Sequence, residues 1–454
     1  MACRDCREHS RSTFIRQAAA QAGRGLPAVE PGMPVPAGTG LNRRSFLIRS
    51  GAAMLSVYGA SRLGFSELEA GIARAQGTAD PVLVSVFLDG GADSLSVLAP
   101  VADDKYRQWR PRLRLEPDEG TPFTEDNSLH WHPRAEKLHT LHQEQKLTVF
   151  PAIGYEDPDQ SHFTSRHYWE VGELAVSTPT GWMGRYLDIV GDPDNPLQGL
   201  SLDGWLSPAL ATSDVPVAAV EGPEYDLWTP GVWTDSPVNT LMYETALDLG
   251  DAHATGGDAG LARAGKVEGQ AMRVRQQLQS LPEVEVPASY PDVYFGRNLA
   301  ALAAMLGAGL PIRCAALSAA GGYDTHDGQE SSFGDDLGDS VESLFAFQRD
   351  LEARGIADRV ITLVWSEFGR RPEENGSAGT DHGAAGTAFL MGTSARGEMV
   401  GEFPGLDVLD EDDNLRSTSD FRAVYSSLLE QWFDQPAEQV IPGAGGFARP
   451  ALIG

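Results

Sequence analysis

The sequence is poor in cysteine and in basic side chains, and it has no apolar run long enough to cross a membrane. Cysteine occurs 3 times, and 64 acidic residues stand against 35 basic ones. Cys3 and Cys6 have the CxxC spacing of many zinc sites, but no second pair accompanies them, so the evidence for zinc is weak. Cys314 stands alone in the mostly apolar run Ile312–Leu317, which is typical of a buried structural thiol.

The acidic excess is uneven along the chain. Residues 1–75 contain 10 Arg, no Lys and 5 acidic residues, or +5, so the rest carries −34 of the total of −29. A surface this acidic repels phosphate backbones, which argues against nucleic-acid binding. Solubility is the simplest role of these charges, although local clusters of acids also suit metal cations.

The N-terminal region has the pattern of a twin-arginine export signal. The paired arginines of Asn42–Leu47 are followed by a mild apolar stretch, Gly51–Ala60, and by a small-x-small cleavage site at Ala73–Ala75. A membrane-spanning helix needs about 20 apolar residues, and this stretch is only about half as long. A retained membrane anchor is therefore the weaker alternative, and a chance pair of arginines is another.

This pattern leads to three expectations about export. Residues 1–75 form a signal region that is removed, although the length of residues 1–41 leaves Met33 as an alternative start. The twin-arginine translocase is the partner during export. The mature protein resides in the periplasm, outside the cell or in the cell envelope, and no stable transmembrane anchor is expected.

The mature chain, residues 76–454, has short apolar runs of the kind found in strands buried on both faces of parallel sheets. Segments with helical periodicity alternate with these runs, so we predict one α/β domain, with a loop-rich insertion near 177–260. The predicted strands are Val82–Leu88, Leu147–Ile153, Ile312–Ala319, Val360–Trp365 and Gly386–Met391. The predicted helices are Arg134–His142, Gly269–Ser280 and three amphipathic segments around 295–306, 337–351 and 421–432, the last with Ser419 as its N-cap.

Acidic and histidine side chains flank these strands. In open α/β sheets, sites form beyond the carboxyl ends of the strands, and carboxylates mixed with imidazoles suit divalent ions such as Zn or Mn. Each segment also has a simpler explanation, such as a Gly turn, a solvated acid, a Glu–Arg pair or a loop hydrogen bond. The candidate ligands are Asp89, Asp93, Asp324, His326, Glu367, Asp381 and His382.

A further candidate segment follows the second strand. Ser161 precedes a predicted helix, and a hydroxyl at a helix N-terminus is stabilised by free N–H groups and the dipole. Ser161 is therefore a candidate nucleophile, with Thr164 as a second candidate hydroxyl, whereas an N-cap or anion-binding role is the simpler alternative. His162 and His167 flank the serine and are candidates for contacts with an anion.

Taken together, these motifs resemble the domain-of-unknown-function family 1501, a family of twin-arginine-exported bacterial proteins in the alkaline-phosphatase-like superfamily. The resemblance covers about residues 82–441. It rests on Leu88–Asp93, Ser161–Phe163, Gly181–Leu187, Tyr323–His326, Ser366–Arg370 and Gly379–Gly383.

The resemblance implies an alkaline-phosphatase-like fold, a large mostly parallel sheet with helices on both faces, holding one or two divalent ions (Zn, Mn or Mg). It implies Asp89 as first ligand, Ser161 as nucleophile, Asp324 with His326 as the next pair, and His382 as the late histidine. Ser366–Glu367 departs from the superfamily, which usually has Asp-His at this place. The departure puts a second metal in doubt.

Two functions follow as hypotheses. The first is a metal-dependent hydrolase of phosphate or sulfate esters, in which His162, Arg185 or Arg370 contacts a small anionic substrate. The second is a non-catalytic exported protein on the same fold that binds a ligand or a partner. No dinucleotide Gly fingerprint is present, which argues against a nicotinamide-dependent oxidoreductase.

Overall fold

The computed structural model describes residues 80–192, 195–220 and 289–454, the strand at Leu55–Tyr58, and single helical positions at 245, 248, 249 and 252. The paired arginines, the cleavage site and the helix expected at Gly269–Ser280 lie outside the described residues. These predictions therefore stay predictions.

The centre of the molecule is a nine-stranded mixed sheet. Five of its eight strand pairings are parallel, which confirms the prediction of a mostly parallel sheet. In spatial order the strands are β1 (Leu55–Tyr58), β8 (Val217–Val220), β7 (Gly199–Ser201), β9 (Cys314–Ser318), β2 (Val82–Phe87), β10 (Val360–Trp365), β13 (Gly386–Met391), β6 (Leu147–Gly154) and β14 (Ser419–Asp420).

Strand β2 shows why these segments form a sheet that is covered on both faces. All six of its residues are buried, and successive side chains enter different hydrophobic clusters. Val82, Val84 and Val86 pack on one side, whereas Leu83 and Phe87 pack on the other. A strand with two apolar faces needs a layer of helices on each side.

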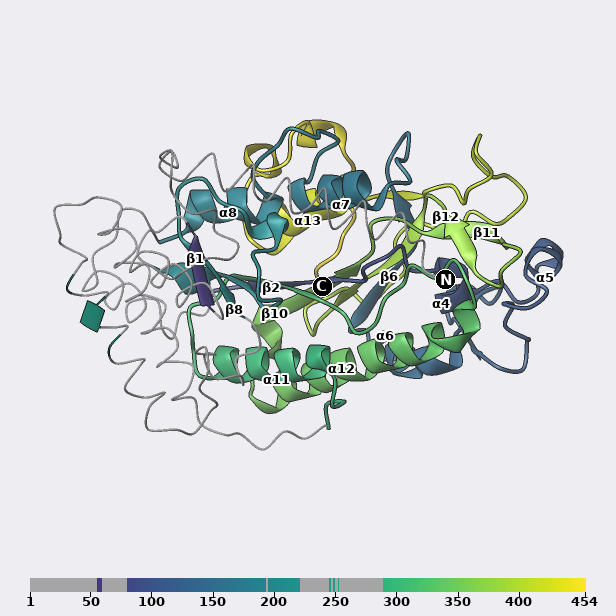
Figure 1. Cartoon of the computed structure of the whole chain (residues 1–454), viewed down its shortest axis with the longest axis horizontal. Coiled ribbons are helices and arrows are strands. Elements are labelled where there is room, and N and C mark those ends of the chain that lie inside the picture. The colour runs from purple at the N-terminus through teal and green to yellow at the C-terminus, as the bar shows by residue number, and fades with distance from the viewer. Residues whose placement is uncertain are drawn as a thin grey trace, which may run out of the picture.

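Helices supply these two layers (Figure 1). One face is covered by α6 (Glu136–Gln143), α11 (Tyr294–Gly307) and α12 (Phe333–Ala353). The opposite face is covered by α7 (His162–Val171), α8 (Trp182–Val190) and α13 (Phe421–Gln431). The predicted fold class, with helices on both faces, is confirmed.

Two details of the predicted elements are wrong. The N-cap of α13 is Asp420 rather than Ser419, because the Asp420 carboxylate accepts a hydrogen bond from the Arg422 N–H. The segment 177–260 is more than a loop-rich insertion in its described part. It contributes β7 and β8 to the central sheet, and both strands are too short to show a clear apolar pattern.

Smaller elements surround one edge of the sheet. The hairpin of β11 (Arg370–Glu374) and β12 (Thr380–His382) and the small sheet of β3 (Leu98–Ala99), β5 (His130–Trp131) and β4 (Thr121–Pro122) lie outside the main sheet. Two short helices, α4 (Ser94–Val97) and α5 (Asp104–Trp109), contact β11. Among the helices in the described residues, none is both long and apolar enough to span a bilayer.

Candidate metal centre

The strand directions bring five distant segments to one edge of the sheet. Strands β9, β2, β10 and β6 share one direction, so their carboxyl ends meet there. Strand β13 runs the opposite way and therefore begins at the same edge. The segments that leave or enter these strands are those the sequence singled out: the turn after β2, the start of α7, the loop after β9, Ser366–Glu367 and Asp381–His382.

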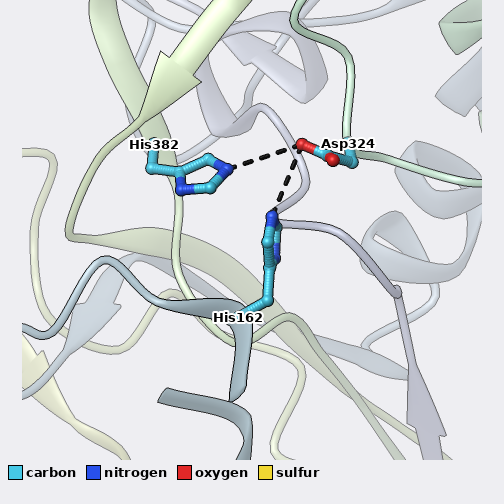
Figure 2. A group of neighbouring side chains, drawn as sticks. All are labelled: His162, Asp324 and His382. Carbon is cyan, nitrogen blue, oxygen red and sulfur yellow. Dashed lines mark ion pairs between the residues drawn. The ribbon is translucent and has the colours of Figure 1, made fainter. Parts of the chain in front are cut away.

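Three side chains meet at this edge: His162, Asp324 and His382. One potential ligand atom from each lies within 4.8 Å of the others. The Oδ1 atom of Asp324 is 3.4 Å from Nε2 of His162 and 3.5 Å from Nε2 of His382 (Figure 2). The His162 and His382 rings meet edge to face with centroids 4.2 Å apart. Within the described residues this is the one such group, and its donors suit a divalent ion.

A third imidazole nitrogen, from His326, lies beside this group. Its Nε2 lies 3.1 Å from Oδ1 of Asp324 and 2.9 Å from Nε2 of His382. Three imidazoles therefore surround one carboxylate oxygen. We call His162, His326, His382 and Asp324 the histidine cluster.

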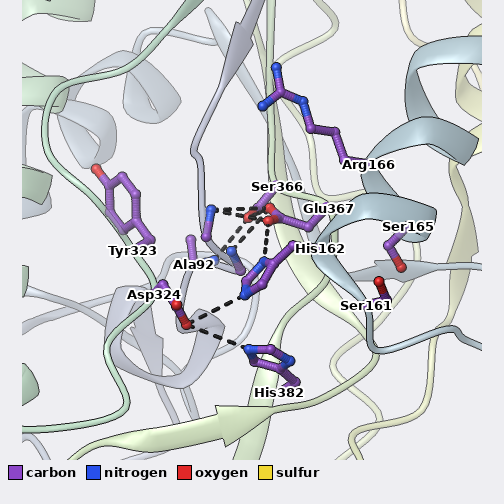
Figure 3. Close-up of polar contacts among 12 residues, drawn as sticks. Ala92, Ser161, His162, Ser165, Arg166, Tyr323, Asp324, Ser366, Glu367 and His382 are labelled. Atoms are coloured by element: carbon purple, nitrogen blue, oxygen red, sulfur yellow. Dashed lines mark hydrogen bonds and ion pairs between the residues drawn. The ribbon is translucent and has the colours of Figure 1, made fainter. Parts of the chain in front are cut away.

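Glu367 fixes His162 from behind. The Nδ1 atom of His162 is 2.7 Å from Oε1 of Glu367, which is only 1% exposed. The backbone N–H groups of Gly90 and Gly91 also donate to this carboxylate, and the hydroxyl of Ser366 lies 3.0 Å from Oε2 (Figure 3). The departure from the superfamily motif thus has a structural role here, because Ser366–Glu367 ties the turn after β2 to His162.

The other two imidazoles are held in the same manner. The Nδ1 atom of His326 lies 3.0 Å from Oδ1 of Asp381. The Nδ1 atom of His382 lies 2.8 Å from the backbone oxygen of Gln160. Asp381 therefore stands behind His326 and does not face the centre of the cluster.

Charge within the cluster shifts the pKa values in opposite directions. Burial raises the pKa of Asp324, but hydrogen bonds from the three histidines and Arg370 outweigh it and hold this pKa far below its usual range. Burial lowers the pKa of His162, but Asp324 and Glu367 raise it to about 9. Burial lowers the pKa of His382, and Asp324 offsets only part of this effect. The metal-free cluster therefore holds Asp324 as an anion beside a protonated His162.

Arg370 has a structural role, which corrects the prediction that it binds substrate. Its side chain is fully buried, and its guanidinium donates to the backbone oxygens of Gly90, Gly91, Tyr323 and Thr380. It also donates to Oδ1 of Asp324 over 2.8 Å. No exposed N–H group of Arg370 is left for an anion, and its charge instead supports the ionised form of Asp324.

Asp93 is likewise a structural residue, which corrects its prediction as a metal ligand. Asp93 and Arg110 are both 0% exposed, and the guanidinium donates to both carboxylate oxygens over 2.6 and 2.9 Å. Ser96 and Gln329 donate to the same carboxylate. With its oxygens occupied by four partner contacts, Asp93 is not available as a ligand in the histidine cluster.

Two further predicted residues lie outside the cluster. Arg185 donates to the backbone oxygens of Val440, Thr180 and Val171, so it ties the start of α8 to neighbouring loops and is not a substrate contact. Asp89 is exposed at the end of β2, near the cluster but outside the convergent donors. Partial burial raises the pKa of Asp89, Arg166 and His162 lower it, and Glu367 and Asp324 raise it further.

The hydroxyl of the candidate nucleophile Ser161 does not face the cluster. Ser161 occupies the N-cap position of α7, but its side chain makes no capping hydrogen bond. Figure 3 shows its hydroxyl on the opposite side of the His162 ring from Asp324, turned toward Ser165. Thr164 lies in the first turn of the same helix, half-buried.

The sequence prediction underrated His162 and missed the backbone groups. His162 was predicted to contact an anion, yet it is the residue that joins Glu367 to Asp324. The only indication of this role in the sequence is that His162 belongs to the motif Ser161–Phe163. The carbonyl of Gln160 and the N–H groups of Gly90 and Gly91 have no side-chain signature, so residue types alone cannot reveal them.

Fold and site together define the class of protein: an α/β protein with a histidine–aspartate group at the carboxyl edge of a mixed sheet. Residues 254–429 match the family model described as "Protein of unknown function (DUF1501)". The matched residues include three of the motifs that carry the family resemblance, Tyr323–His326, Ser366–Arg370 and Gly379–Gly383, and the match agrees with the resemblance over this part of the chain.

The solved structures that resemble this chain include two of low sequence identity. One is the PsFucS1 sulfatase from Pseudoalteromonas sp., with 10% identity, a TM-score of 0.34, and coverage of 85% of this chain and 77% of that one. Another is a protein in the alkaline phosphatase superfamily from Vibrio parahaemolyticus, with 10% identity, a TM-score of 0.31, and coverage of 87% and 76%. A search of curated proteins finds no match.

Proposed function

We propose that this protein is an exported hydrolase of phosphate or sulfate esters that depends on a divalent metal ion at the histidine cluster. One observation carries the proposal: three imidazole nitrogens surround Oδ1 of Asp324, at 3.1 to 3.5 Å. Such a set of donors is costly to desolvate and is typical of cation sites. A bound divalent ion polarises an ester oxygen and offsets the charge that develops on it.

In this proposal, some residues bind the metal ion and another acts as the nucleophile. Asp324 and the histidines hold the ion, and Arg370 keeps Asp324 ionised. Ser161 is the proposed nucleophile, because it directly precedes His162 and rotation about its Cα–Cβ bond changes the side its hydroxyl faces. Exposed Asp89 lies on the rim of the same edge.

Metal content and ester turnover test this function together. The mature protein, metal-free and then loaded with Zn, Mn or Mg, is assayed on a panel of aryl phosphates and aryl sulfates. We expect turnover only with metal, and a loss of at least 100-fold in Asp324→Asn and His382→Gln. Asp335→Asn is the matched control, since Asp335 forms an exposed ion pair with Arg134. Absence of turnover in folded, metal-loaded protein would refute the hydrolase.

A second function, binding without catalysis, is favoured by one observation. The hydroxyl of Ser161 turns away from Asp324 in Figure 3, and this orientation agrees with a protein in which Ser161 is not a nucleophile. This alternative predicts one tightly held metal ion, no turnover on any ester, and unchanged metal affinity in Ser161→Ala. The hydrolase predicts instead that Ser161→Ala loses turnover and keeps its metal.

A further inference from the structure

A cavity of about 230 Å³ lies apart from the histidine cluster. Its walls come from the segment that follows α5, from His132 and the short turn η1 (Pro133–Ala135), and from the start of α12 with the turn η4 (Gln329–Ser331) before it. No residue of the cluster is among the described residues that line this cavity. Cavities of roughly 150 Å³ already admit a benzene-sized molecule, so this cavity has room for a small organic ligand.

Part of the cavity wall is apolar. Tyr106, Leu115 and Phe333 are buried and line the cavity. The ring of His132 meets that of Phe333 nearly edge to face, with the ring centroids 6.1 Å apart. An apolar ring or chain placed against these side chains would be removed from water, which favours binding. The cavity therefore suits a ligand with an apolar body.

His132 supplies a hydrogen-bond donor to the same cavity. Its Nδ1 atom accepts a hydrogen bond from the backbone N–H of Arg134 over 3.1 Å, so in the neutral ring the hydrogen is on Nε2. Burial lowers the pKa of His132, Arg134 lowers it further, and Glu119 and Asp93 offset only part of this effect. The ring is therefore neutral, and its Nε2–H group has no acceptor among the described residues.

Arg114 and the start of α12 add positive charge to this wall. The Nε atom of Arg114 donates to Glu116 over 2.7 Å, whereas its Nη2 atom has no acceptor in the part of the chain that the structure describes. Gly334 is the second residue of α12, and a Cβ added there would lie 3.6 Å from Cε1 of His132. The positive end of the helix dipole therefore lies beside the His132 ring.

The other charges along the walls limit the charge that a ligand can carry. Arg112 and Arg114 line the cavity together with two exposed acids, Glu119 and Glu330. Two positive and two negative side chains offset each other, so a dianion such as a phosphate ester would be repelled by the acids. A single carboxylate needs only the two donors that lack acceptors, on His132 and Arg114.

The floor of the cavity is held in shape by Gln329, which is 2% exposed. Its side-chain amide donates to Asp93 and Ser96, and its Oε1 atom accepts from the hydroxyls of Thr325 and Thr380. Because its donors and its acceptor are all engaged, Gln329 does not need to move when a ligand enters. The cavity is thus formed before binding, which reduces the entropy that binding costs.

We propose that this cavity binds a small carboxylate with an apolar body. The carboxylate accepts hydrogen bonds from His132 and Arg114, and the apolar part packs against Leu115 and Phe333. The proposed binding requires neither a metal ion nor the ester hydrolysis proposed above, so either proposal can fail without the other.

Calorimetry on the mature protein, treated with a chelator so that no metal ion takes part, tests this site. Benzoate is the probe, benzyl alcohol is its uncharged analogue of similar size, and acetate lacks the apolar body. We expect benzoate to bind roughly 10-fold more tightly than either, because only benzoate meets both the donors and the apolar wall. Benzoate that binds no better than benzyl alcohol, or that does not bind, would overturn the proposal.

Two substitutions test the donors separately. His132→Phe keeps a ring in place and removes the Nε2–H group, and Arg114→Gln removes a charge from a partly exposed side chain. Each is expected to weaken benzoate roughly 10-fold and to change benzyl alcohol binding less. Arg107→Gln is the matched control, since Arg107 is an exposed arginine of α5 that does not line the cavity.

Thermal unfolding shows whether each variant is folded. His132 also accepts the hydrogen bond at the start of η1, so His132→Phe carries the greater risk to folding. Arg114→Gln then still decides the question. An unchanged affinity for benzoate in folded Arg114→Gln, or an equal loss in Arg107→Gln, would contradict the carboxylate site.

Discussion

At the scale of single residues, the use of each carboxylate oxygen decides what each acid does. Asp324 offers one oxygen to three imidazoles and is partly exposed, with a side chain 34% accessible. Asp93 and Glu367 have no accessible side-chain surface, and their oxygens are taken by neighbours. The three acids thus differ in role. Asp324 is a candidate metal ligand, Asp93 is an ion-pair partner of Arg110, and Glu367 holds the ring of His162 in place.

The buried pair of Asp93 and Arg110 leads to a prediction about stability. Asp93→Ala leaves the Arg110 guanidinium buried without its counter-charge, so we expect the free energy of unfolding to fall by about 3–5 kcal/mol. Denaturant unfolding measures this change. Asp335→Ala, which removes an exposed ion pair, is the control and is expected to change stability by less than about 0.5 kcal/mol. Similar losses in both variants would contradict the structural role of Asp93.

His162 leads to a prediction about pH in the metal-free protein. Its pKa is about 9 in the folded chain against an ordinary value of 6.5, so its protonated form stabilises the folded state. This contribution is complete below pH 6.5 and is lost as pH rises through 9, amounting to at most about 3 kcal/mol. Urea unfolding with a chelator, from pH 6.5 to 9, measures it. His162→Gln should remove this part of the slope; an identical pH dependence in both proteins would disprove it.

At the scale of elements, the turn that follows β2 joins three parts of the site. Gly90 has φ +115°, and Gly91 has φ +71°. The N–H groups of both donate to Glu367, and their carbonyls accept from Arg370. A turn with two successive positive φ values is accessible to glycine and is strained for residues with a Cβ.

Gly90→Ala tests the close packing of this turn. An added Cβ would lie 2.4 Å from the backbone nitrogen of Asp324, so the turn and the loop after β9 must separate. We expect a loss of metal affinity and a fall of more than about 2 kcal/mol in unfolding free energy. The matched control is Gly355→Ala, which also has positive φ (+69°) but meets no atom within 4 Å. Equal costs in the two variants would show that backbone strain alone matters at Gly90.

At the scale of the whole molecule, the sheet topology brings the segments of the site to one edge of the sheet. The strands that carry the site are neighbours in the order β9-β2-β10-β13-β6. Helices cover both faces of the sheet (Figure 1). The polar residues of the cluster lie at the carboxyl ends of the strands, which the helices leave uncovered. The export prediction rests on other residues, and it is tested in cells and not on the purified protein.

Replacing Arg43 and Arg44 together by lysine tests the export route. Twin-arginine signals depend on the pair of guanidinium groups, so we expect the unprocessed protein to accumulate in the cytoplasm and the mature form to disappear from the exported fraction. Fractionation and immunoblotting measure this outcome. Replacing Arg16 and Arg24 by lysine is the control, since it changes two arginines upstream of the motif. Unaltered export of the double variant would refute the twin-arginine route.

The sequence by itself determined the strands that form the centre of the sheet and the short segments that carry the site. Runs such as Val360–Trp365 and Gly386–Met391 have the observed bounds of β10 and β13, because burial on both faces demands continuous apolar residues. The same reasoning could not find β7 and β8, which have only three and four residues.

Only the tertiary structure decided which polar residues meet. Asp93 and Asp324 look alike in sequence. In the structure, Asp93 forms a buried ion pair with Arg110, whereas three histidines surround Asp324. The inward nitrogen of each imidazole depends on a partner that lies 55 to 222 positions away along the chain. Contacts over such separations follow from strand order and loop packing. A backbone donor such as the N–H group of Gly90 cannot be predicted from residue type, because no side chain is involved.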